Sequence, residues 1–300
     1  MSRASPSAGD LAAIVVCTLA WGTTWYAITL QLGVVEPIVS VVYRFALAGA
    51  VLMVWGAVRR APLSLTRAQH GAAAGMGVAT FALQYPLVYL AEGHLASAVV
   101  AVMFAAMSFF NLVAFRLVYR QRAPLVSWAA SGMGIAGVAL LSWGELTESR
   151  MDASAIVGLG LTSLAVVLSA MGNLFARRVE NTGASVIAST AWAMLYGAGA
   201  LAVFATLRGA RWAFDPRPAY VLSLIYLALA GSVIAFLLYY GLARRRGFAL
   251  ASYISALTPL VAMAVSTVFE AKRWSVFAFV GVAVILAGQW LLLRGARTAK

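Results

Sequence analysis

The sequence predicts an all-α membrane protein of ten transmembrane helices, and three observations carry that prediction. The 300-residue chain is 63% hydrophobic and 10% charged, and its mean hydropathy is +0.91, values that do not describe a soluble protein. Apolar runs of about 20 residues, the length that crosses a bilayer, recur from one end of the chain to the other. Charged residues gather in short clusters between those runs. No room is left for a soluble domain.

Each predicted span is an apolar run that ends at charged residues or at a Pro or Gly turn. The connections between spans three and four, and between spans eight and nine, are short enough to predict tight helical hairpins. No convincing cleavage site follows the first span, so it is expected to be retained as a helix, with a signal anchor as the alternative. The ten spans are 11–31, 37–57, 70–91, 95–118, 124–143, 154–176, 184–207, 219–243, 247–269 and 274–293.

Basic residues are distributed unequally between the two sides that these spans define. The loops and termini on the side of both chain ends carry 14 Lys and Arg residues, and the other side carries 6. Because basic residues are enriched in cytoplasmic loops, the count places both termini in the cytoplasm of a bacterial inner membrane. An odd number of spans would destroy this asymmetry.

Several classes of function lack their sequence features. The net charge of +13 forms no extended basic stripe of the kind that binds nucleic acid. Cys17 is the only cysteine, and no metal-ligand pattern surrounds it, so neither a disulfide nor a metal site is expected. The G-x-G-x-x-G pattern of Gly132–Gly137 lies inside an apolar span, where its glycines favour close helix packing. No phosphate-binding loop is present, and no cofactor is expected.

The chain also resembles itself at an offset of about 150 residues. Trp21-Gly22-Thr23 lies opposite Met171-Gly172-Asn173, and Leu87–Tyr89 lies opposite Leu237–Tyr239. Two five-span units, 1–150 and 151–300, follow from this offset. Because five is odd, the two units must cross the membrane in opposite senses, as inverted repeats do in transporters.

The residues also carry a family resemblance. The stretch WGTTWYAITLQLGVVEPIVSVVYRFALAGAVL at 21–52 and the stretch at 237–292 resemble the EamA-type repeats of the drug/metabolite transporter superfamily. Within that superfamily, the Trp-rich first span is most similar to bacterial amino-acid exporters of the YddG type. The resemblance implies that helices three, four, eight and nine line a central cavity. The first half departs from the pattern, since Ser108-Phe109 stands where the family has Thr-Pro.

Arg44 is the basic residue well inside a span. A charge in the membrane costs several kcal/mol unless it faces the bundle interior or water, so Arg44 is a candidate for binding a substrate carboxylate. The alternative is that Arg44 ties down helix ends or reaches the outer interface.

Aromatic and amide side chains recur at helical spacing near the predicted mid-membrane, which favours a ring-lined cavity for small amphiphilic solutes. The alternative is that some of these rings pack between helices or anchor span ends. Pro259, near the middle of span nine, is a candidate hinge. With Arg44, the candidate substrate-binding residues are Trp21, Trp25, Gln84, Tyr85, Tyr89, Phe104, Ser108, Trp192, Tyr239 and Tyr253.

All nine acidic residues fall in predicted loops or at span ends. A missing mid-membrane carboxylate favours a facilitator, or coupling through groups that the sequence does not identify. The sequence thus predicts a secondary transporter that exports small metabolites, amino acids including aromatic ones, as a monomer or weak homodimer. A broader drug or nucleobase exporter is the alternative. A membrane enzyme would need a buried acid, base or nucleophile pair, and a retinal-type receptor would need a lysine inside a span; neither is present.

Overall fold

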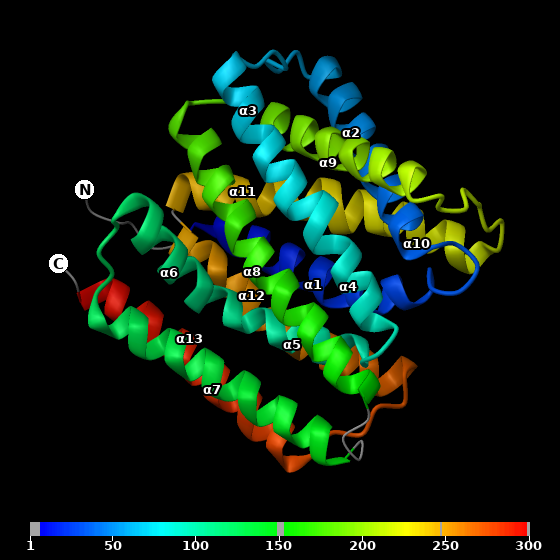
Figure 1. Ribbon diagram of the computed structural model, residues 1–300. Helices are drawn as coiled ribbons and strands as arrows, with labels where there is room; N and C mark the ends of the chain where they lie inside the picture. Colours follow the sequence, from blue (N-terminus) through cyan, green and yellow to red (C-terminus); the bar gives the residue numbers. More distant parts are fainter. Residues whose placement is uncertain (1–6, 149–152, 247, 299–300) are drawn as a thin grey trace.

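The computed structural model describes residues 7–148, 153–246 and 248–298, and every regular element in these ranges is a helix. Figure 1 shows long helices lying side by side, with most of them running between the same two ends of the molecule. The predicted all-α class is therefore confirmed for the described part of the chain.

The helices follow the order of the predicted spans. Helices that continue directly into one another, namely α3–η1–α4, α5–η2–α6 and α10–η3–α11, form one helical stretch each, and the stretches are numbered as the spans are. The first half contains α1 Ala8–Thr29, α2 Pro37–Val58, α3 Arg67–Met76, η1 Gly77–Gln84, α4 Tyr85–Glu92, α5 Ser97–Met103, η2 Phe104–Ala106, α6 Met107–Tyr119 and α7 Leu125–Glu148. The second half contains α8 Ala153–Asn181, α9 Val186–Leu207, α10 Pro218–Ala228, η3 Leu229–Ile234, α11 Ala235–Arg246, α12 Phe248–Phe269 and α13 Val276–Thr298.

Local sequence signals explain where several helices begin. At the start of α1 the Ser7 hydroxyl accepts from the Asp10 N–H (3.2 Å), and the Asp10 carboxylate accepts from the Ser7 N–H (3.1 Å). Thr66 and Gln69 form the same reciprocal cap on α3. Pro37 opens α2, at a position where a missing N–H costs no helical hydrogen bond.

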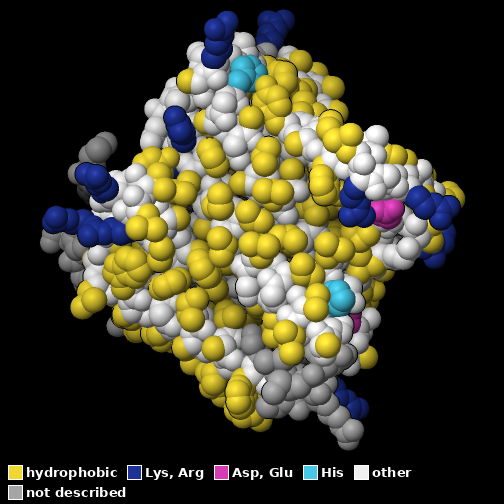
Figure 2. Space-filling view, viewed as in Figure 1, with side chains coloured by type: hydrophobic (Ala, Val, Ile, Leu, Met, Phe, Trp, Pro, Cys, Tyr) yellow, Lys and Arg dark blue, Asp and Glu magenta, His cyan; other side chains and the backbone are white. Residues whose placement is uncertain are grey.

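The surface of these helices suits a lipid bilayer. Seven helical stretches are long and apolar enough to cross a membrane, and three more, at Leu125–Leu141, Leu257–Phe269 and Val276–Gly288, are apolar but shorter within the described residues. Figure 2 shows hydrophobic atoms across the middle of one face, with most Lys and Arg near its margins. Such an extended apolar surface indicates a multi-pass membrane protein. That all ten predicted spans cross the membrane stays a prediction.

Three of the long stretches are not α-helical throughout. η2 is a short 3-10 turn, and η1 and η3 are wider π-helical turns. In the first π turn, the N–H of Tyr85 bonds to the carbonyl of Thr80, five residues earlier. Pro86 follows directly, and its ring would clash with a carbonyl in a regular α-turn, so the wider turn accommodates it.

Glycines allow the closest contacts between the two halves of the chain. α7 packs along α13, and α2 packs along α9. A side chain on Gly137 of α7 would overlap the carbonyl of Gly281 on α13, whereas Gly132 on the same helix faces open space. The expected packing role of the G-x-G-x-x-G pattern is therefore confirmed at Gly137.

The molecule has two distinct ends. α13 ends at the left of Figure 1, and we call this side, where α1 also begins, the terminal end. Asp10 and Arg246 form an ion pair there (2.8 Å). The opposite side, the distal end, carries the loops 30–36, 93–96, 208–217 and 270–275, including an ion pair between Glu36 and Arg208 (2.9 Å).

Candidate functional site

A central cavity lies within the core of the bundle. It contains about 720 Å³ of empty space, a figure that includes its open mouth. Among the described residues that line it, none is charged. The lining residues are Trp21, Thr24, Trp25, Ile28, Thr80, Gln84, Tyr85, Ala101, Phe104, Met107, Ser169, Asn173, Phe236, Tyr239, Tyr240, Ser255 and Thr258.

Aromatic rings form one wall of the cavity. The ring of Trp21 lies 5.3 Å from that of Phe236 and 5.2 Å from that of Tyr239, and the rings of Trp25 and Phe104 are 5.1 Å apart. Tilted and edge contacts at these distances are favourable and hold each ring against its neighbours. The wall therefore offers fixed ring faces and edges to a solute.

Among the described cavity residues, two buried side-chain atoms have no hydrogen-bond partner. They are the indole N–H of Trp25, a donor, and the amide oxygen of Gln84, an acceptor, and both atoms are buried. Leaving a buried polar atom unpaired costs about 1–3 kcal/mol. A ligand or water that offers one acceptor and one donor would remove this cost.

Six of the predicted binding residues line the central cavity, namely Trp21, Trp25, Gln84, Tyr85, Phe104 and Tyr239. The cavity walls differ from those that the family resemblance implied. Besides the third, fourth, eighth and ninth helical stretches, the first and sixth stretches, α1 and α8, contribute lining residues. The set of four helices was therefore too small.

Arg44 and Tyr89 lie outside the lining of the central cavity. The side chain of Arg44 is 1% exposed, and its Nε–H donates to the hydroxyl of Ser232 (3.0 Å). Its guanidinium carbon lies 4.7 Å from the ring centre of Tyr85, so Arg44 contacts a cavity residue without lining the cavity. The Tyr89 hydroxyl donates to the side-chain oxygen of Gln31 (2.8 Å).

Ser108 and Trp192 are also not among the lining residues. The Ser108 hydroxyl donates to the carbonyl of Ala105 (3.3 Å), and the Trp192 indole donates to the carbonyl of Leu63 (3.0 Å). The side chain of Tyr253 lies outside the described part of the chain. Pro259 lies inside α12, one residue after the cavity residue Thr258.

The sequence reasoning missed the contribution of α8, which supplies Ser169 and Asn173. The amide nitrogen of Asn173 donates to the side-chain oxygen of Asn111 (3.2 Å). The internal repeat contained the signal, because Asn173 lies opposite Thr23 in the repeat offset, next to the cavity residue Thr24. Phe236 was missed because spacing alone does not tell which rings of an apolar helix face inward.

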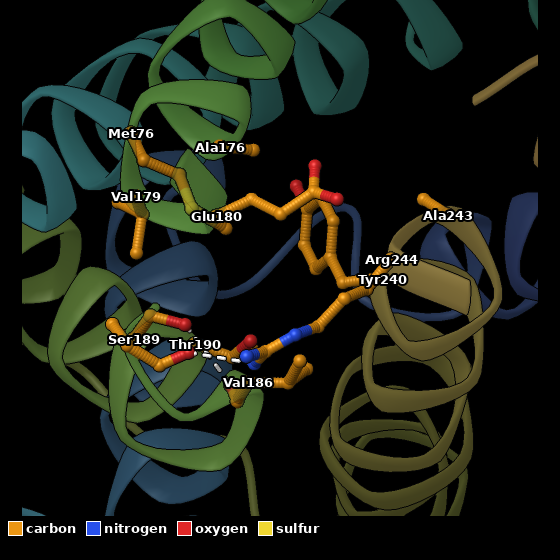
Figure 3. A pocket seen from close by; sticks show the side chains of 11 residues that line it. Met76, Ala176, Val179, Glu180, Val186, Ser189, Thr190, Tyr240, Ala243 and Arg244 are labelled. Atoms are coloured by element: carbon orange, nitrogen blue, oxygen red, sulfur yellow. Dashed lines mark hydrogen bonds between the residues drawn. The ribbon is translucent and has the colours of Figure 1, made fainter. Parts of the chain in front are cut away.

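A second pocket lies between α3, α8, α9 and α11, near the terminal end. It contains about 370 Å³ of empty space including its opening. Figure 3 shows the side chains of Glu180, Tyr240 and Arg244 around it. Glu180 is paired with Arg177 (2.9 Å), and Arg244 donates to the carbonyl of Ala184 (2.8 Å). Tyr240 lines both pockets and therefore stands between them.

Comparisons with known proteins agree with this architecture. A model of the EamA-like transporter family matches residues 7–143 and 156–294. The "uncharacterized inner membrane transporter YedA" of Escherichia coli (strain K12) is 25% identical over 94% of this chain and 90% of its own length. Protein PagO of Salmonella typhimurium is 25% identical over 93% of this chain and 91% of its own.

A third relative, named a probable amino-acid metabolite efflux pump of Escherichia coli (strain K12), is 23% identical over 97% of this chain and 96% of its own length. A solved crystal structure superposes with a TM-score of 0.73, covering 99% of this chain and 100% of the other, at 18% identity. A likeness at that identity supports a shared fold.

Proposed function

The chain belongs to the EamA-like transporter family, and from this premise we propose that it is a secondary transporter that exports small metabolites, in particular amino acids including aromatic ones. The observation that carries the choice of solute is the neutral, ring-lined central cavity with an unpaired donor on Trp25 and an unpaired acceptor on Gln84. An aromatic side chain would pack against this ring wall, while the Trp25 N–H would donate to the carboxylate of the amino acid and the Gln84 oxygen would accept from its ammonium group.

We propose ten spans in two inverted repeats, residues 1–150 and 151–300, and the backbone supports the repeat. Among the described residues, six have positive φ, and they fall into three pairs separated by 149 to 151 residues. Each pair follows corresponding helical stretches of the two halves. The pairs are Gly33 with Gly183, Arg60 with Gly209, and Arg120 with Ala271.

The cavity walls support the same symmetry. The lining helices come in corresponding pairs of stretches, the first and sixth, the third and eighth, and the fourth and ninth. The third and eighth stretches each contain a π turn, η1 and η3. The helix contacts show the same symmetry. α1 of the first stretch packs on α12 of the ninth, and the corresponding α8 of the sixth stretch packs on α6 of the fourth. Two repeats of opposite sense would enclose a binding site near the bilayer midplane, as in other secondary transporters.

The proposed mechanism is alternating access, and the two ends of the cavity differ. At the distal end, α5 packs against α12 and all residues of α5 are buried, whereas Met107 is the one buried residue of α6. At the terminal end, Tyr240 stands between the central cavity and the pocket of Glu180 and Arg244. We assign the structure to a state closed at the distal end, in which Tyr240 separates the cavity from the terminal side.

The terminal end is assigned to the cytoplasm from the 14-to-6 excess of basic residues. A solute would then enter past Tyr240 and leave through the distal end. Because the sequence has no nucleotide-binding motif, we expect transport to run down the solute gradient without ATP.

Counterflow tests this proposal. Purified protein is reconstituted into liposomes loaded with one unlabelled amino acid, and entry of the same labelled amino acid is followed without ATP. Accumulation with aromatic or other neutral amino acids supports the proposal. Absence of counterflow for the whole amino-acid panel would overturn it.

A nucleobase exporter is the second candidate, and one observation favours it over a cationic-drug exporter. The described cavity lining has no carboxylate to receive a cation, yet its rings and its donor–acceptor pair suit a neutral planar heterocycle. Counterflow of a nucleobase, together with no counterflow of any amino acid, would select this candidate.

A further inference from the structure

A group of polar residues, four of them buried and one half-buried, lies between the central cavity and the distal end, and the mechanism above does not use it. We call it the distal polar cluster and define it as Arg44, Tyr89, Glu92, Ser97 and Glu270. Arg44 and Tyr89 come from the second and third helical stretches, and Glu270 follows α12. Because α5 and α12 close the distal end, this cluster lies where that closure is made.

Glu92 is the last residue of α4 and is buried, with 6% of its surface exposed. Neither of its carboxyl oxygens has a hydrogen-bond partner. The Glu270 carboxyl differs, because it accepts from the backbone N–H of Ser97 (3.3 Å) and from the Ser97 hydroxyl (2.8 Å). These two bonds tie the end of α12 to the start of α5, so they hold the distal end closed.

The charges around Glu92 can be followed helix by helix. α4 packs against α1, α2, α5 and α8. In the distal halves of these four helices, Arg44 is the one charged side chain. Glu92 interacts electrostatically with Arg44 and with Glu270. His94, two residues on, points to Ser154, whose hydroxyl lies 2.8 Å from its Nδ1.

The Glu270 carboxyl has hydrogen-bond donors of its own, and Lys272 and Arg273 follow it in the same loop. Among the described residues, by contrast, Arg44 is the one cation that acts on Glu92. A second anion at Glu92 would be buried without a donor and without a further cation, and several kcal/mol oppose such a charge. Arg44 does not relieve it by a hydrogen bond in this structure, since both carboxyl oxygens of Glu92 and the Nη1 of Arg44 are without partners. The closed arrangement thus suits Glu92 only as the neutral acid.

We propose that Glu92 is a proton-binding site, and that the distal end closes only when Glu92 has taken up a proton from the distal side. On opening, Glu270 parts from Ser97, water reaches Glu92, and its O–H bond breaks to release the proton to that same side. On closing, a proton from the distal side protonates the carboxylate before it is buried. The proton enters and leaves on one side, so the site sets the rate of opening without moving protons across the membrane.

This inference rests on the proposed alternating access, but it can be tested without a substrate. Ala101 lines the central cavity and is 1% exposed, so a cysteine there meets a reagent from the distal side only when that end opens. Ala101→Cys is made in a Cys17→Ala background, and a membrane-impermeant maleimide is added outside intact cells. The labelling rate is measured from roughly pH 6 to roughly pH 8.5.

Because a thiol itself reacts faster as pH rises, the readout is a ratio of rates. We expect the labelling rate of the Glu92-containing protein, divided by that of Glu92→Gln, to rise at least about threefold over this range, since the amide stays neutral while the acid ionises. A ratio that does not change with pH would overturn the proposal.

Glu36→Gln is the matched control, because it removes another distal carboxyl. A hydrogen bond from the Arg211 N–H and the neighbouring Arg208 guanidinium hold the pKa of Glu36 below its ordinary value. Glu36 therefore stays ionised over the tested range, and Glu36→Gln should keep the pH dependence of the unmodified Glu92 protein. Loss of the pH dependence in this variant would contradict the assignment to Glu92.

Two further measurements keep the proposal testable if Glu92→Gln does not fold. Ser97→Ala removes the hydroxyl donor to Glu270, and it should speed labelling at every pH while keeping the pH dependence.

The second measurement follows protons directly. A pH-sensitive dye inside liposomes should show no proton movement with substrate counterflow. Proton entry in fixed proportion to substrate exit would overturn same-side release. A failure of counterflow alone would count against the proposed function and leave the labelling result intact.

Discussion

The indole N–H of Trp21 donates to the backbone carbonyl of Gly231 at 3.1 Å, across 210 residues of sequence. This bond joins α1, in the first half of the chain, to the π turn η3 in the second. Ser232 follows directly and accepts from Arg44. The ring wall of the cavity and the distal polar cluster therefore meet in one irregular turn, so a change at Trp21 acts on binding and on packing together.

Two substitutions at Trp21 separate these effects. Trp21→Phe keeps a ring but leaves the Gly231 carbonyl without its donor, which should cost about 1 kcal/mol of stability and lower the melting temperature by a few degrees. Trp21→Ala also removes the ring, so apparent affinity in counterflow should fall as well. Equal loss of affinity in both variants would show that the hydrogen bond to Gly231, rather than the ring face of Trp21, determines solute affinity.

The unpaired cavity atoms predict an unusual combination of effects. Trp25→Phe removes the donor and Gln84→Leu removes the acceptor, and neither removes a hydrogen bond within the empty protein. Each variant should weaken solute binding by about three- to tenfold, the worth of one neutral hydrogen bond, while the melting temperature stays level or rises. Phe104→Leu, which changes a ring of the same wall, serves as the comparison. A lower melting temperature with unchanged affinity would remove these atoms from the site.

Helix packing between the halves can be tested at a pair of glycines on α7. Gly137→Ala would place a methyl group against the Gly281 carbonyl, and overpacking of this kind costs about 1–3 kcal/mol. Gly132→Ala is the control, because open space surrounds that position and alanine is the better helix former. Thermal unfolding in detergent should show a loss in the first and no loss in the second. Equal melting temperatures would contradict the close contact of α7 with α13.

The residues that sequence reasoning found are those whose signal is local. Hydrophobic length located the helical stretches, and ring spacing located Trp21 and Trp25 on the cavity wall. Burial from distant helices left no such signal. Glu92 was correctly expected at a span end, but its burial comes from the packing of α4 against other helices, which no spacing within one helix records. The pairing of Glu270 with Ser97, 173 residues apart, is equally a product of the fold.

Membrane orientation remains a prediction, and two exposed positions test it. Gly93 lies at the distal end and Asn181 at the terminal end. In a Cys17→Ala background, an impermeant maleimide added to intact cells should label Gly93→Cys, whereas Asn181→Cys should require permeabilised cells. The reverse pattern would invert the topology and with it the proposed direction of export.

Pro259 links the cavity to the motion that alternating access requires. It lies inside α12, where it has no N–H for the carbonyl of Ser255, and both Ser255 and Thr258 line the cavity. The Thr258 hydroxyl donates to the Ile254 carbonyl (2.7 Å), which secures the turn before the proline but leaves the next one without its backbone bond. α12 is therefore weakest beside the central cavity and able to bend there.

Pro259→Ala restores the missing donor, so the melting temperature should stay level or rise while counterflow slows several-fold. Pro37→Ala, at the first turn of α2 where no helical bond is missing, should leave the counterflow rate unchanged. If Pro259→Ala loses melting temperature and the surviving protein transports at the normal rate, Pro259 is a packing residue and the hinge lies elsewhere.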